Sequence, residues 1–402
     1  MSWWWAGAIG AARKRQDDDH AAASASEQED FKSVALVVGS TGIVGASLVD
    51  ILPQPDTPGG PWKVYALSRR ALPPWSPPSS SAITHIHADL TDPAGAAAAL
   101  APLTDITHVF YVAWTWRATE EENCAANSAM LRNVLAAVAQ NCPKLAHVSL
   151  QTGTRHYFGR LDIKDPVHDP PYTEEMPRLD MPVFYYDQED VLLDVVGGAA
   201  AAVSWSVHRP NIIFGFSPRC AINLVCCLCV YAAICRKQGA PLRWPGSRAG
   251  WEGFITPSDA DLIAEQHIWA GVEPMAKNEA FNCSNGDVCT WKRLWPVLAA
   301  RFGLEWVGYE GEERRPKLAE AMAGKDEALW EGIVEEEGLV ATRASEVVNW
   351  WIIDKALERY GLDLDIIDSM NKSKEHGFLG FRDTVKSFNT CIDRLKAHKI
   401  VP

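Results

Sequence analysis

The segment from residue 33 to residue 51 constrains the fold of this chain more than any other. It begins with the apolar run SVALVV and continues through GSTGIVG into a stretch with helical spacing. Glycine at position 39 allows a tight turn, glycine at 42 lets backbone N–H groups approach a pyrophosphate, and glycine at 45 permits close packing of helix on strand. A plain strand-to-helix turn is the alternative, but this context favours a dinucleotide cradle. The candidate cofactor-binding residues here are Gly39, Thr41, Gly42, Ile43 and Gly45.

Further β-rich runs follow and alternate with helical spacing. The expected strands cover residues 33–39, 63–69, 84–90, 108–114, 147–153 and 204–210. Several are almost wholly apolar, as strands buried on both faces are. Between the fourth and fifth strands, Met130, Val134 and Val138 form an apolar stripe with helical spacing. This alternation predicts an α/β fold, a Rossmann-type doubly wound parallel sheet with right-handed crossovers.

The regular alternation ends near Pro210, and the remainder is expected to be mainly helical. The expected helices cover residues 221–236, 257–270, 291–302, 315–337 and 343–360. We therefore expect an N-terminal arm at residues 1–30 and an NADP-binding Rossmann domain at residues 31–215. Residues 256–290 are expected to pack back onto that domain. Residues 216–255 and 291–402 would form a smaller, mainly helical substrate-binding cap over the carboxyl edge of the sheet.

The end of the second expected strand indicates which dinucleotide binds. An NAD site places a carboxylate here for the ribose 2′-hydroxyl, whereas this chain has Ser68, Arg69 and Arg70. A hydroxyl and two guanidinium groups suit the 2′-phosphate of NADPH, because charged bidentate hydrogen bonds are strong. NADPH is therefore the expected cofactor. Asp89 and Leu90, at the end of the third strand, are the candidates for contact with the adenine.

The overall charge and the cysteine pattern exclude several classes of partner. The chain has 402 residues, a net charge of −13 and no long basic run, which argues against binding to nucleic acid. Its ten cysteines are scattered without the spacing of a metal site, so we expect buried reduced thiols and no metal. The apolar run at 224–234 is too short for membrane insertion, and the amino terminus does not resemble a signal peptide. A cytoplasmic protein with small-molecule partners is expected.

The stretch FYYDQED at residues 184–190 carries the expected catalytic acid. A short-chain dehydrogenase normally has Tyr-x-x-x-Lys on this helix, and the lysine lowers the tyrosine pKa and helps to relay the proton. Here Glu189 stands four residues after Tyr185, and Asp190 stands four residues after Tyr186. Neighbours on a helix point about 100° apart, so only one tyrosine can face a nicotinamide. Both could be structural aromatics, but their place between the fifth and sixth strands favours a catalytic role.

The missing lysine affects which reaction the site can support. An isolated tyrosine is a poor proton source for an alkoxide, so simple ketone reduction is disfavoured. Hydride addition to the β-carbon of an enone forms a less basic, delocalised enolate, which needs a hydrogen-bond donor more than a proton relay. Arg155, just after the fifth strand, is a candidate second cation. It would supply a positive field without shuttling protons; its alternative role is to brace a loop.

Several stretches along the chain carry a family resemblance. They include STGIVG, GPWKVYALSRR, THVFYVAWT, LQTGTRHY, FYYDQED, WSVHRPNIIFGFSP and DSMNKSKEHGFLGFRDT. With them the chain resembles the plant progesterone 5β-reductase and iridoid synthase-like (PRISE) family of atypical extended short-chain reductases. The resemblance implies NADPH-dependent 1,4-reduction of activated enones, such as Δ4-3-oxosteroids, 8-oxogeranial or smaller enones.

The resemblance also implies roles for individual residues. The catalytic tyrosine of the family is the first of the pair, here Tyr185, and the family's displaced lysine falls on Arg155. Trp114 and Ile352 fall at the implied substrate wall, where Ile352 replaces an aromatic residue, so a wider pocket is expected. The stretch at 210–217 resembles the border of the nicotinamide. Its candidate cofactor contacts are Pro210, Ile212 and Ser217.

Three functions are therefore open at the level of the sequence. The first is an NADPH-dependent enone reductase with a small hydrophobic substrate. The second is a nucleotide-sensing protein that binds NADPH with weak or lost catalysis, because Arg155 replaces the family lysine. The third is an ordinary carbonyl reductase or epimerase, which the missing lysine disfavours. A homodimer is a candidate assembly.

Overall fold

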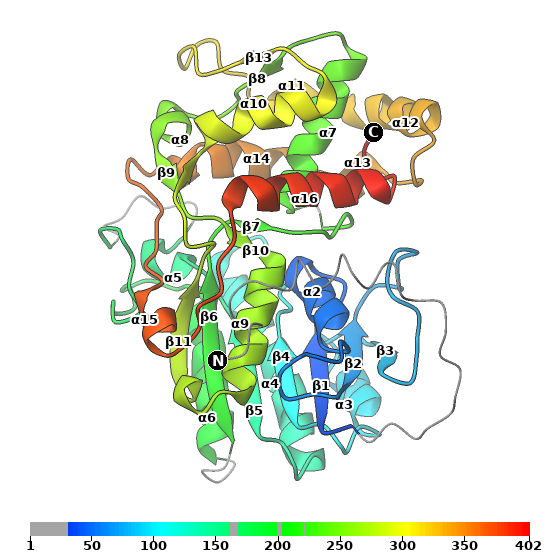
Figure 1. Cartoon of the computed structure of the whole chain (residues 1–402), viewed down its shortest axis with the longest axis vertical. Helices are drawn as coiled ribbons and strands as arrows, with labels where there is room; N and C mark the ends of the chain where they lie inside the picture. The colour runs from blue at the N-terminus through cyan, green and yellow to red at the C-terminus, as the bar shows by residue number, and fades with distance from the viewer. Residues whose placement is uncertain (1–30, 161–167, 199–202, 221) are drawn as a thin grey trace.

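The structure is a computed structural model that describes residues 31–160, 168–198, 203–220 and 222–402. The expected N-terminal arm lies outside these ranges. The described chain has two parts, which follow one another along its long axis (Figure 1). One is a sheet with helices on both faces, and the other is a group of helices over the carboxyl edge of that sheet.

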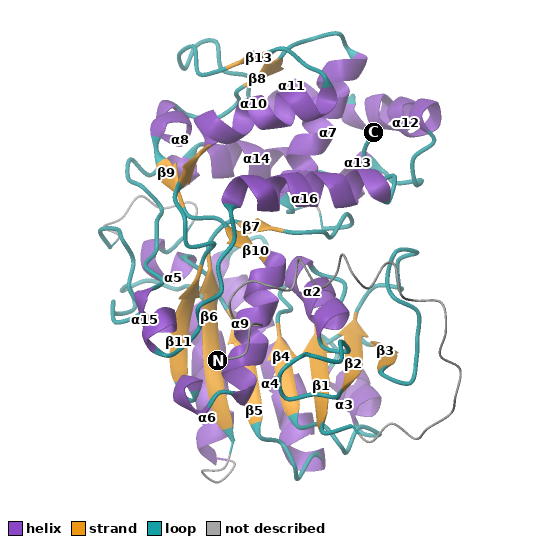
Figure 2. Ribbon diagram, viewed as in Figure 1, coloured by secondary structure: helices purple, strands orange, loops and turns teal. Residues whose placement is uncertain are grey.

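A seven-stranded parallel sheet organises the first part (Figure 2). Its strand order is β11-β6-β5-β4-β1-β2-β3, so the order reverses between β1 and β4. Doubly wound sheets bind ligands at the carboxyl ends of the strands at this reversal. The Rossmann-type α/β fold expected from the sequence is confirmed. The strands are β1 (Ser33–Val38), β2 (Trp62–Ser68), β3 (Ile83–His87), β4 (His108–Tyr111), β5 (His147–Gln151), β6 (Ser204–Pro210) and β11 (Glu279–Cys283).

Strand β1 shows why these runs are apolar throughout. Its side chains alternate between two cores: Ala35 and Val37 pack on one face, whereas Leu36 and Val38 pack on the other. A strand covered on both faces has no solvent side, so its sequence lacks polar alternation. The covering helices are α2 (Ile43–Ile51) and α9 (Ala260–Val272) on the first face, and α3 (Pro93–Leu100), α4 (Glu120–Asn141) and α6 (Phe184–Gly198) on the second.

Strand β11 is an element that the sequence pattern did not predict. It follows α9 and pairs in parallel with β6, with Phe281 opposite His208. The segment EAFNC is short and mixes polar with apolar residues, so its periodicity is weak. Its position in the sheet becomes clear only from the pairing. Two-residue strands complete the β structure: β7 (Ile213–Phe214), β8 (Leu242–Arg243), β9 (Phe254–Ile255), β10 (Ser258–Asp259), β12 (Cys289–Thr290) and β13 (Trp306–Val307).

The helices of the second part enclose a core of their own. Helix α7 runs through its centre and is buried from Leu224 to Cys235. Two expectations about helix length are wrong, because the single helices expected at 315–337 and 343–360 are each divided into shorter elements. The helices are α5 (Arg155–Phe158), α7 (Leu224–Lys237), α8 (Arg248–Glu252), α10 (Trp291–Phe302), α11 (Leu318–Met322), α12 (Asp326–Glu337), α13 (Ala344–Val347), α14 (Trp350–Leu357), α15 (Asn371–Glu375) and α16 (Thr384–Ala397), with the 3-10 turns η2 (Pro274–Ala276) and η3 (Arg359–Gly361).

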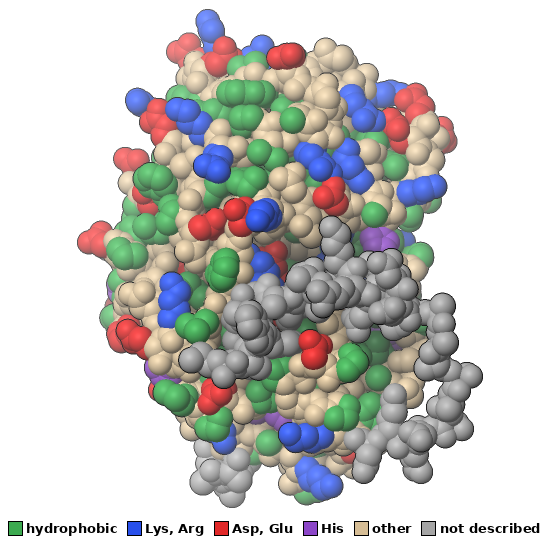
Figure 3. Space-filling view, viewed as in Figure 1, with side chains coloured by type: hydrophobic (Ala, Val, Ile, Leu, Met, Phe, Trp, Pro, Cys, Tyr) green, Lys and Arg blue, Asp and Glu red, His purple; other side chains and the backbone are tan. Residues whose placement is uncertain are grey.

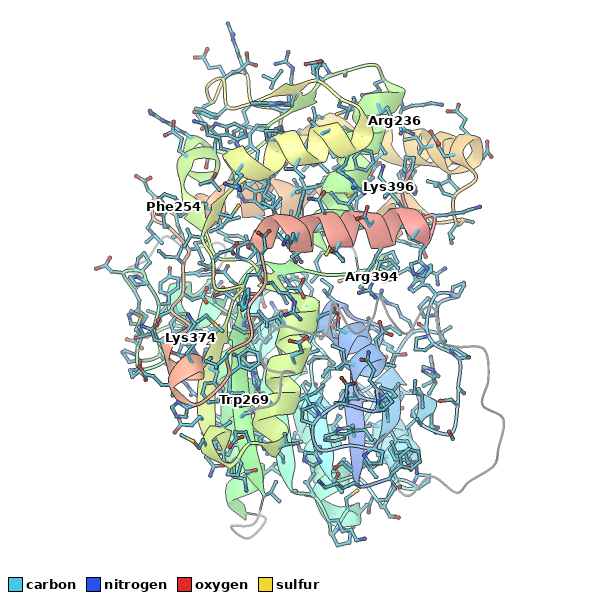
Figure 4. All side chains as sticks on the ribbon, viewed as in Figure 1. Arg236, Phe254, Trp269, Lys374, Arg394 and Lys396 are labelled. Atoms are coloured by element: carbon cyan, nitrogen blue, oxygen red, sulfur yellow. The ribbon has the colours of Figure 1, made fainter. Side chains whose placement is uncertain are left out.

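The two parts are linked by ion pairs as well as by the chain. Arg394, labelled in Figure 4, extends from α16 towards α2, and its guanidinium lies 3.2 Å from the carboxylate of Asp50. Acidic and basic side chains are interspersed over the face shown in Figure 3. All ten cysteines lie in described segments, and no disulfide bond joins them. Among the described residues there is no side-chain group arranged to hold a metal ion, and no helix is long and apolar enough to cross a bilayer.

A buried polar network joins the centre of the sheet to α9. The imidazole of His147 lies 2.9 Å from the hydroxyls of both Ser204 and Ser206, and Ser206 lies 3.0 Å from His208. The other ring nitrogen of His208 lies 2.8 Å from the side-chain oxygen of Gln266. Burial lowers the pKa of His208 to about 4. The ring is therefore neutral in the folded protein at neutral pH.

Acidification should destabilise the fold through these histidines. An unfolded histidine has a pKa of about 6.5, so between about pH 6.5 and pH 4 the unfolded chain binds a proton that folded His208 does not. The free energy of unfolding should then fall by up to about 1.4 kcal/mol per pH unit for each such ring. Urea unfolding at about pH 7 and about pH 5 should show a smaller difference for His208→Asn than for the wild type. Equal differences would contradict this account.

Candidate active site

The turn between β1 and α2 is shaped to bring backbone close to a ligand. Gly39 has φ +94°, and a Cβ there would lie 3.0 Å from the backbone of Ala113 at the end of β4. A Cβ on Gly45 would lie 2.1 Å from the carbonyl oxygen of Gly39, so α2 packs on the turn only without a side chain. Gly42 caps α2 with no side-chain hydrogen bond. The first N–H groups of the helix are therefore open to a phosphate.

A groove of about 220 Å³ starts at this turn and collects most of the expected cofactor residues. It extends over the ends of β1, β2, β3 and β4, at the reversal of strand order. Ser217 does not line it but braces the turn, because its hydroxyl donates to the Thr41 carbonyl at 2.9 Å. Gly45 likewise acts through packing. The expected residues that line the groove are Gly39, Thr41, Gly42, Ile43, Ser68, Arg69, Arg70, Asp89 and Leu90.

The arginines at the end of β2 form a cationic edge of this groove. Among the described residues, neither Arg69 nor Arg70 has a carboxylate within ion-pair distance, although the chain is acidic overall. Arg70 donates to the backbone carbonyl of Arg219, whose guanidinium stacks on the ring of Trp75 at 5.5 Å. Sequence reasoning missed Arg219, because it follows β7, far along the chain. Unpaired guanidinium groups in a groove suit a phosphate ligand.

The Asp89 side chain forms hydrogen bonds within the turn that follows β3. Its carboxylate accepts hydrogen bonds from the backbone N–H and the hydroxyl of Thr91, at 2.9 and 2.8 Å. These bonds are the main cause that lowers the pKa of Asp89, with help from the charge of Arg69. The carboxylate of Asp89 is therefore directed at Thr91. A ligand in the groove would contact the neighbouring residues Ala88 and Leu90 at the end of β3.

A second cavity, of about 230 Å³, lies between the sheet and the helical cap. It shares Ile43, Trp114 and Gln151 with the groove, so the two cavities adjoin. Its walls combine residues at the ends of β4, β5 and β6 with residues of α14 and η3. The expected residues that the structure brings together here are Trp114, Arg155, Tyr185, Pro210, Ile212 and Ile352.

Tyr185 and Tyr186 point in different directions, because neighbouring residues on a helix are about 100° apart. Tyr185 lines the cavity, and its hydroxyl lies close to Gly153, where a Cβ would approach it to 3.0 Å. Among the described residues this hydroxyl has no hydrogen-bond partner. Tyr186 points away: its hydroxyl donates to the His156 carbonyl at 2.7 Å and accepts from the Leu179 N–H at 3.1 Å. Tyr186 therefore has a structural role, and Tyr185 is the tyrosine open to a ligand.

Arg155 is held beside Tyr185 by a buried carboxylate. Its Nη2 lies 2.8 Å from Glu120 Oε1, and its Nε donates to the Gly159 carbonyl at 3.0 Å. The same Glu120 oxygen accepts the N–H of Phe184 at 3.0 Å. The guanidinium carbon lies 5.9 Å from the centre of the Tyr185 ring. Burial raises the pKa of Tyr185, the charge of Arg155 opposes that rise, and Glu120 adds to it.

Glu189 fills the position of the usual lysine and has a structural role. Its two oxygens lie 3.2 Å from the guanidinium groups of Arg209 and Arg178, and one lies 3.7 Å from His156 Nδ1. Burial alone would raise the pKa of Glu189, but the contact with His156 and the charges of both arginines hold it at about 2. Glu189 is therefore ionised and engaged at neutral pH. Asp190 pairs with Arg178 at 2.7 Å on the outer side.

Aromatic side chains dominate the wall of the cavity. Trp114 stacks on Phe184 with centroids 6.0 Å apart, and Trp116 extends the row to Trp351 at 5.9 Å. The three tryptophans are about two-fifths exposed, with values of 39, 46 and 40%. Sequence reasoning missed Trp116, Phe158, Phe184 and Tyr360 as lining residues. Adjacency to Trp114 and Tyr185 was a signal for Trp116 and Phe184, whereas nothing local indicated Phe158 or Tyr360.

Comparison with known proteins decides the family. A family model described as a PRISE-like Rossmann-fold domain matches residues 35–402. The chain belongs to the PRISE family.

Curated PRISE relatives cover nearly the whole chain. The 3-oxo-Delta(4,5)-steroid 5-beta-reductase of Arabidopsis thaliana is 55% identical over 375 residues, which is 93% of this chain and 94% of that protein. An (S)-8-oxocitronellyl enol synthase of Nepeta cataria is 54% identical over 374 residues, with the same coverage of 93% and 94%. The corresponding enzyme of Catharanthus roseus is 46% identical over 376 residues, or 93% and 94% of the two chains.

Solved structures that resemble this PRISE chain share its fold. UDP-glucose 4-epimerase from Thermotoga maritima has a TM-score of 0.60 and 12% identity, covering 90% of this chain and 99% of its own. The Thermus thermophilus enzyme of that name, in complex with NAD, has a TM-score of 0.58 and 15% identity, with coverage of 90% and 99%. At these identities the likeness shows the fold alone.

Restoring the usual lysine in this PRISE chain should damage the fold. Glu189→Lys would place a third cation against Arg178 and Arg209 in a buried site. Breaking a buried ion pair in this way costs about 3–5 kcal/mol of unfolding free energy. Asp190→Lys is the matched control, because its exposed pair with Arg178 contributes at most about 1 kcal/mol. Chemical denaturation of both variants measures the difference, and similar losses would refute the structural role of Glu189.

Proposed function

We propose that this PRISE member is an NADPH-dependent enone reductase that adds hydride to the β-carbon of an activated C=C bond. The observation that carries the proposal is the Tyr185 hydroxyl. It faces the cavity without a partner among the described residues, beside the end of β5, whose Gln151 borders both cavities. A hydrogen-bond donor at that place can stabilise a developing enolate oxygen.

The groove has the residues to hold the cofactor. The N-terminus of α2 would bind the pyrophosphate. Arg69 and Arg70, which no described carboxylate pairs with, would bind the 2′-phosphate. Pro210 and Ile212 would border the nicotinamide, since they line the cavity that adjoins the groove. NADPH, when bound, supplies the hydride. The turn between β1 and α2, in which Gly39 has a positive φ, supports the assignment of the groove to NADPH.

Tyr185 would act on the carbonyl oxygen of the substrate. Its hydroxyl donates a hydrogen bond to that oxygen, and negative charge gathers there as the β-carbon accepts hydride. Burial raises the pKa of Tyr185 above its ordinary value, with Arg155 opposing, so the hydroxyl keeps its proton at neutral pH. The enolate then collapses to the ketone when its α-carbon takes a proton from water. The phenol proton need not leave, so no relay is required.

Arg155 would contribute a fixed positive charge. Its contacts with Glu120 and Gly159 orient the guanidinium beside the Tyr185 ring. Since an arginine does not give up its proton in proteins, it can stabilise the enolate but cannot shuttle protons. This is sufficient for enolate chemistry and poor for ketone reduction. Glu189, ionised in the position of the usual lysine, disfavours the ordinary carbonyl reductase further.

The walls of the cavity favour an apolar substrate. Trp114, Phe184 and Ile352 present hydrocarbon around the reacting atoms, which excludes water and strengthens the hydrogen bond from Tyr185. The relatives named above are a steroid 5β-reductase and 8-oxocitronellyl enol synthases. We propose a Δ4-3-oxosteroid or a smaller enone as the substrate class. The free thiols suit a reducing compartment, and we propose the cytoplasm.

Tyr185→Phe should abolish most of the turnover. Loss of one oxyanion donor lowers kcat by about 10²–10³, and the phenylalanine keeps the packing of the ring. Consumption of NADPH with progesterone and with 2-cyclohexen-1-one, followed by absorbance, measures the effect. Tyr186→Phe is the matched control, because its hydroxyl bonds only to backbone groups of His156 and Leu179. If the wild type consumes NADPH no faster than Tyr185→Phe does, the proposed enone reductase activity is wrong.

The second candidate function is an NADPH-binding protein with weak or lost catalysis. The observation in its favour is that Arg155 is engaged with Glu120 and lacks the mobility of a lysine. In that case the wild type would bind NADPH without consuming it, and Arg155→Lys would gain turnover. If the enone reductase is correct, Arg155→Lys changes the rate only modestly, because it keeps the charge.

NADPH should be preferred over NADH because of the arginine edge. Arg69→Ala and Arg70→Ala each remove a charged hydrogen bond to the 2′-phosphate, which should weaken NADPH binding about 10- to 100-fold. Binding of NADH, which lacks that phosphate, should change little. Isothermal titration of the binary complexes measures both constants. Arg248→Ala is the control, because Arg248 pairs with Glu252 on the exposed surface of the cap. Equal wild-type affinity for the two nucleotides would contradict the assignment.

A further inference from the structure

Tyr360 brings a second phenol hydroxyl into the cavity, from the side of the cap. It lines the cavity with Tyr185 and Arg155. Its ring stacks on that of Phe158, with centroids 5.7 Å apart and planes 17° apart. Among the described residues its hydroxyl has no hydrogen-bond partner. Two phenols therefore line the cavity with no hydrogen-bond partner in the part of the chain that the structure describes, and the mechanism proposed above uses only one.

The backbone at Tyr360 has a conformation that tyrosine rarely adopts. Tyr360 has φ 55° and ψ 23°, and the preceding residue, Arg359, also has φ 55°. With Gly361 at φ 78°, three consecutive residues are in the left-handed region. Such a conformation is unfavourable for residues with a side chain. It persists only where the surroundings impose it, and such positions cluster at ligand sites.

Arg359 imposes this turn from outside the cavity. Its buried guanidinium donates to the carbonyls of Phe254 and Leu364, at 2.9 and 2.7 Å, and lies 2.6 Å from the Asp365 carboxylate. Phe254, labelled in Figure 4, stands at the edge of the molecule beside α8. A Cβ on Gly253 would lie 2.0 Å from the guanidinium, so that glycine makes room for it. These contacts of Arg359 hold the turn, and none of them involves the Tyr360 hydroxyl.

Tyr360 keeps its proton under ordinary conditions. Burial raises its pKa to about 12, with the charge of Arg155 opposing and Tyr185 adding. The hydroxyl is therefore a neutral donor in a wall that is otherwise formed by Phe158, Ile352 and similar apolar side chains. Tyr360 is partly buried and lines the cavity, so a ligand oxygen placed there could accept a hydrogen bond from its hydroxyl.

We propose that Tyr360 is a substrate-positioning residue, whose hydroxyl donates a hydrogen bond to a second oxygen of the substrate, remote from the enone carbonyl. This rests on the proposed function, because it assigns the reacting carbonyl to Tyr185. Tyr185 lies on α6, which packs on the sheet, and Tyr360 lies in η3 of the cap, so a substrate held by both spans the boundary between the two parts. The cavity then selects enones that carry an oxygen at their far end over enones that end in hydrocarbon.

Two steroids that differ in one oxygen test this inference. Progesterone carries an oxygen on its side chain, whereas pregn-4-en-3-one has the same enone and the same carbon skeleton but no other oxygen. The wild type should prefer progesterone in kcat/KM and in binding by about 3- to 10-fold, the effect of one neutral hydrogen bond. Tyr360→Phe should lose that preference through weaker progesterone binding, with pregn-4-en-3-one unaffected. Tyr309→Phe is the control, because its hydroxyl bonds to Glu312 on the exposed surface of the cap.

The outcomes separate this inference from the proposed function. The same preference in Tyr360→Phe and in the wild type, or no preference in either, overturns the positioning role. Turnover of 2-cyclohexen-1-one, which has one oxygen, reports on Tyr185 alone, so the reductase can stand while the inference falls. If no enone is turned over, the proposed function fails. Quenching of tryptophan fluorescence by the two steroids, with NADP⁺ present, then decides the inference from their binding constants.

Discussion

The carboxylate of Glu120 connects the elements on which the candidate site depends. It stands at the start of α4, pairs with Arg155 of α5 and accepts the first N–H of α6 from Phe184. Helix α6 then presents Tyr185 to the cavity. A buried carboxylate is unfavourable unless its oxygens are matched by charge and hydrogen bonds. Arg155 and the Phe184 N–H meet that need, so the cation and the phenol are positioned together.

The position of the positive charge distinguishes this site from the ordinary short-chain arrangement. In the ordinary motif the cation follows the tyrosine on the same helix. Here that place belongs to Glu189, which joins Arg178, Arg209 and His156 in a buried network. The cation beside Tyr185 comes instead from the element after β5. A fixed charge in that position would stabilise a delocalised anion but would offer no mobile proton, which suits the enolate chemistry proposed above.

Local patterns in the sequence were enough for most of the fold and for the glycine turn at which the groove starts. Apolar runs predicted the strands from β1 to β6, and the glycine turn with Arg69 and Arg70 predicted one edge of the groove. Each of these features depends only on residues that lie close to one another in the sequence. Strand β11 could not be predicted, because its five residues are identified as a strand only by their pairing with β6. The helix expected at 315–337 is divided at Gly324, whose left-handed conformation the periodicity did not indicate.

Parts of the site that join distant segments were beyond the sequence. Glu120 and Arg155 are separated along the chain by helix α4 and strand β5, and no spacing rule identifies their pairing. Tyr360 is further removed, because its orientation depends on a left-handed turn held by Arg359 and made possible by Gly253. The role of Gly45 was inferred from the motif. The steric reason for it, which is the close approach of Gly39, is visible only in the structure. Long-range packing sets the first two, whereas the third depends on a contact within a single turn.

The shared wall of the two cavities has a kinetic consequence. Ile43, Trp114 and Gln151 border both the groove and the pocket, so the place where the nicotinamide would lie is also the floor on which the substrate would rest. A substrate bound first would obstruct the end of the groove, and a nucleotide bound first would complete the floor. A chain built in this way would work by an ordered sequence, in which the nucleotide enters first and leaves last.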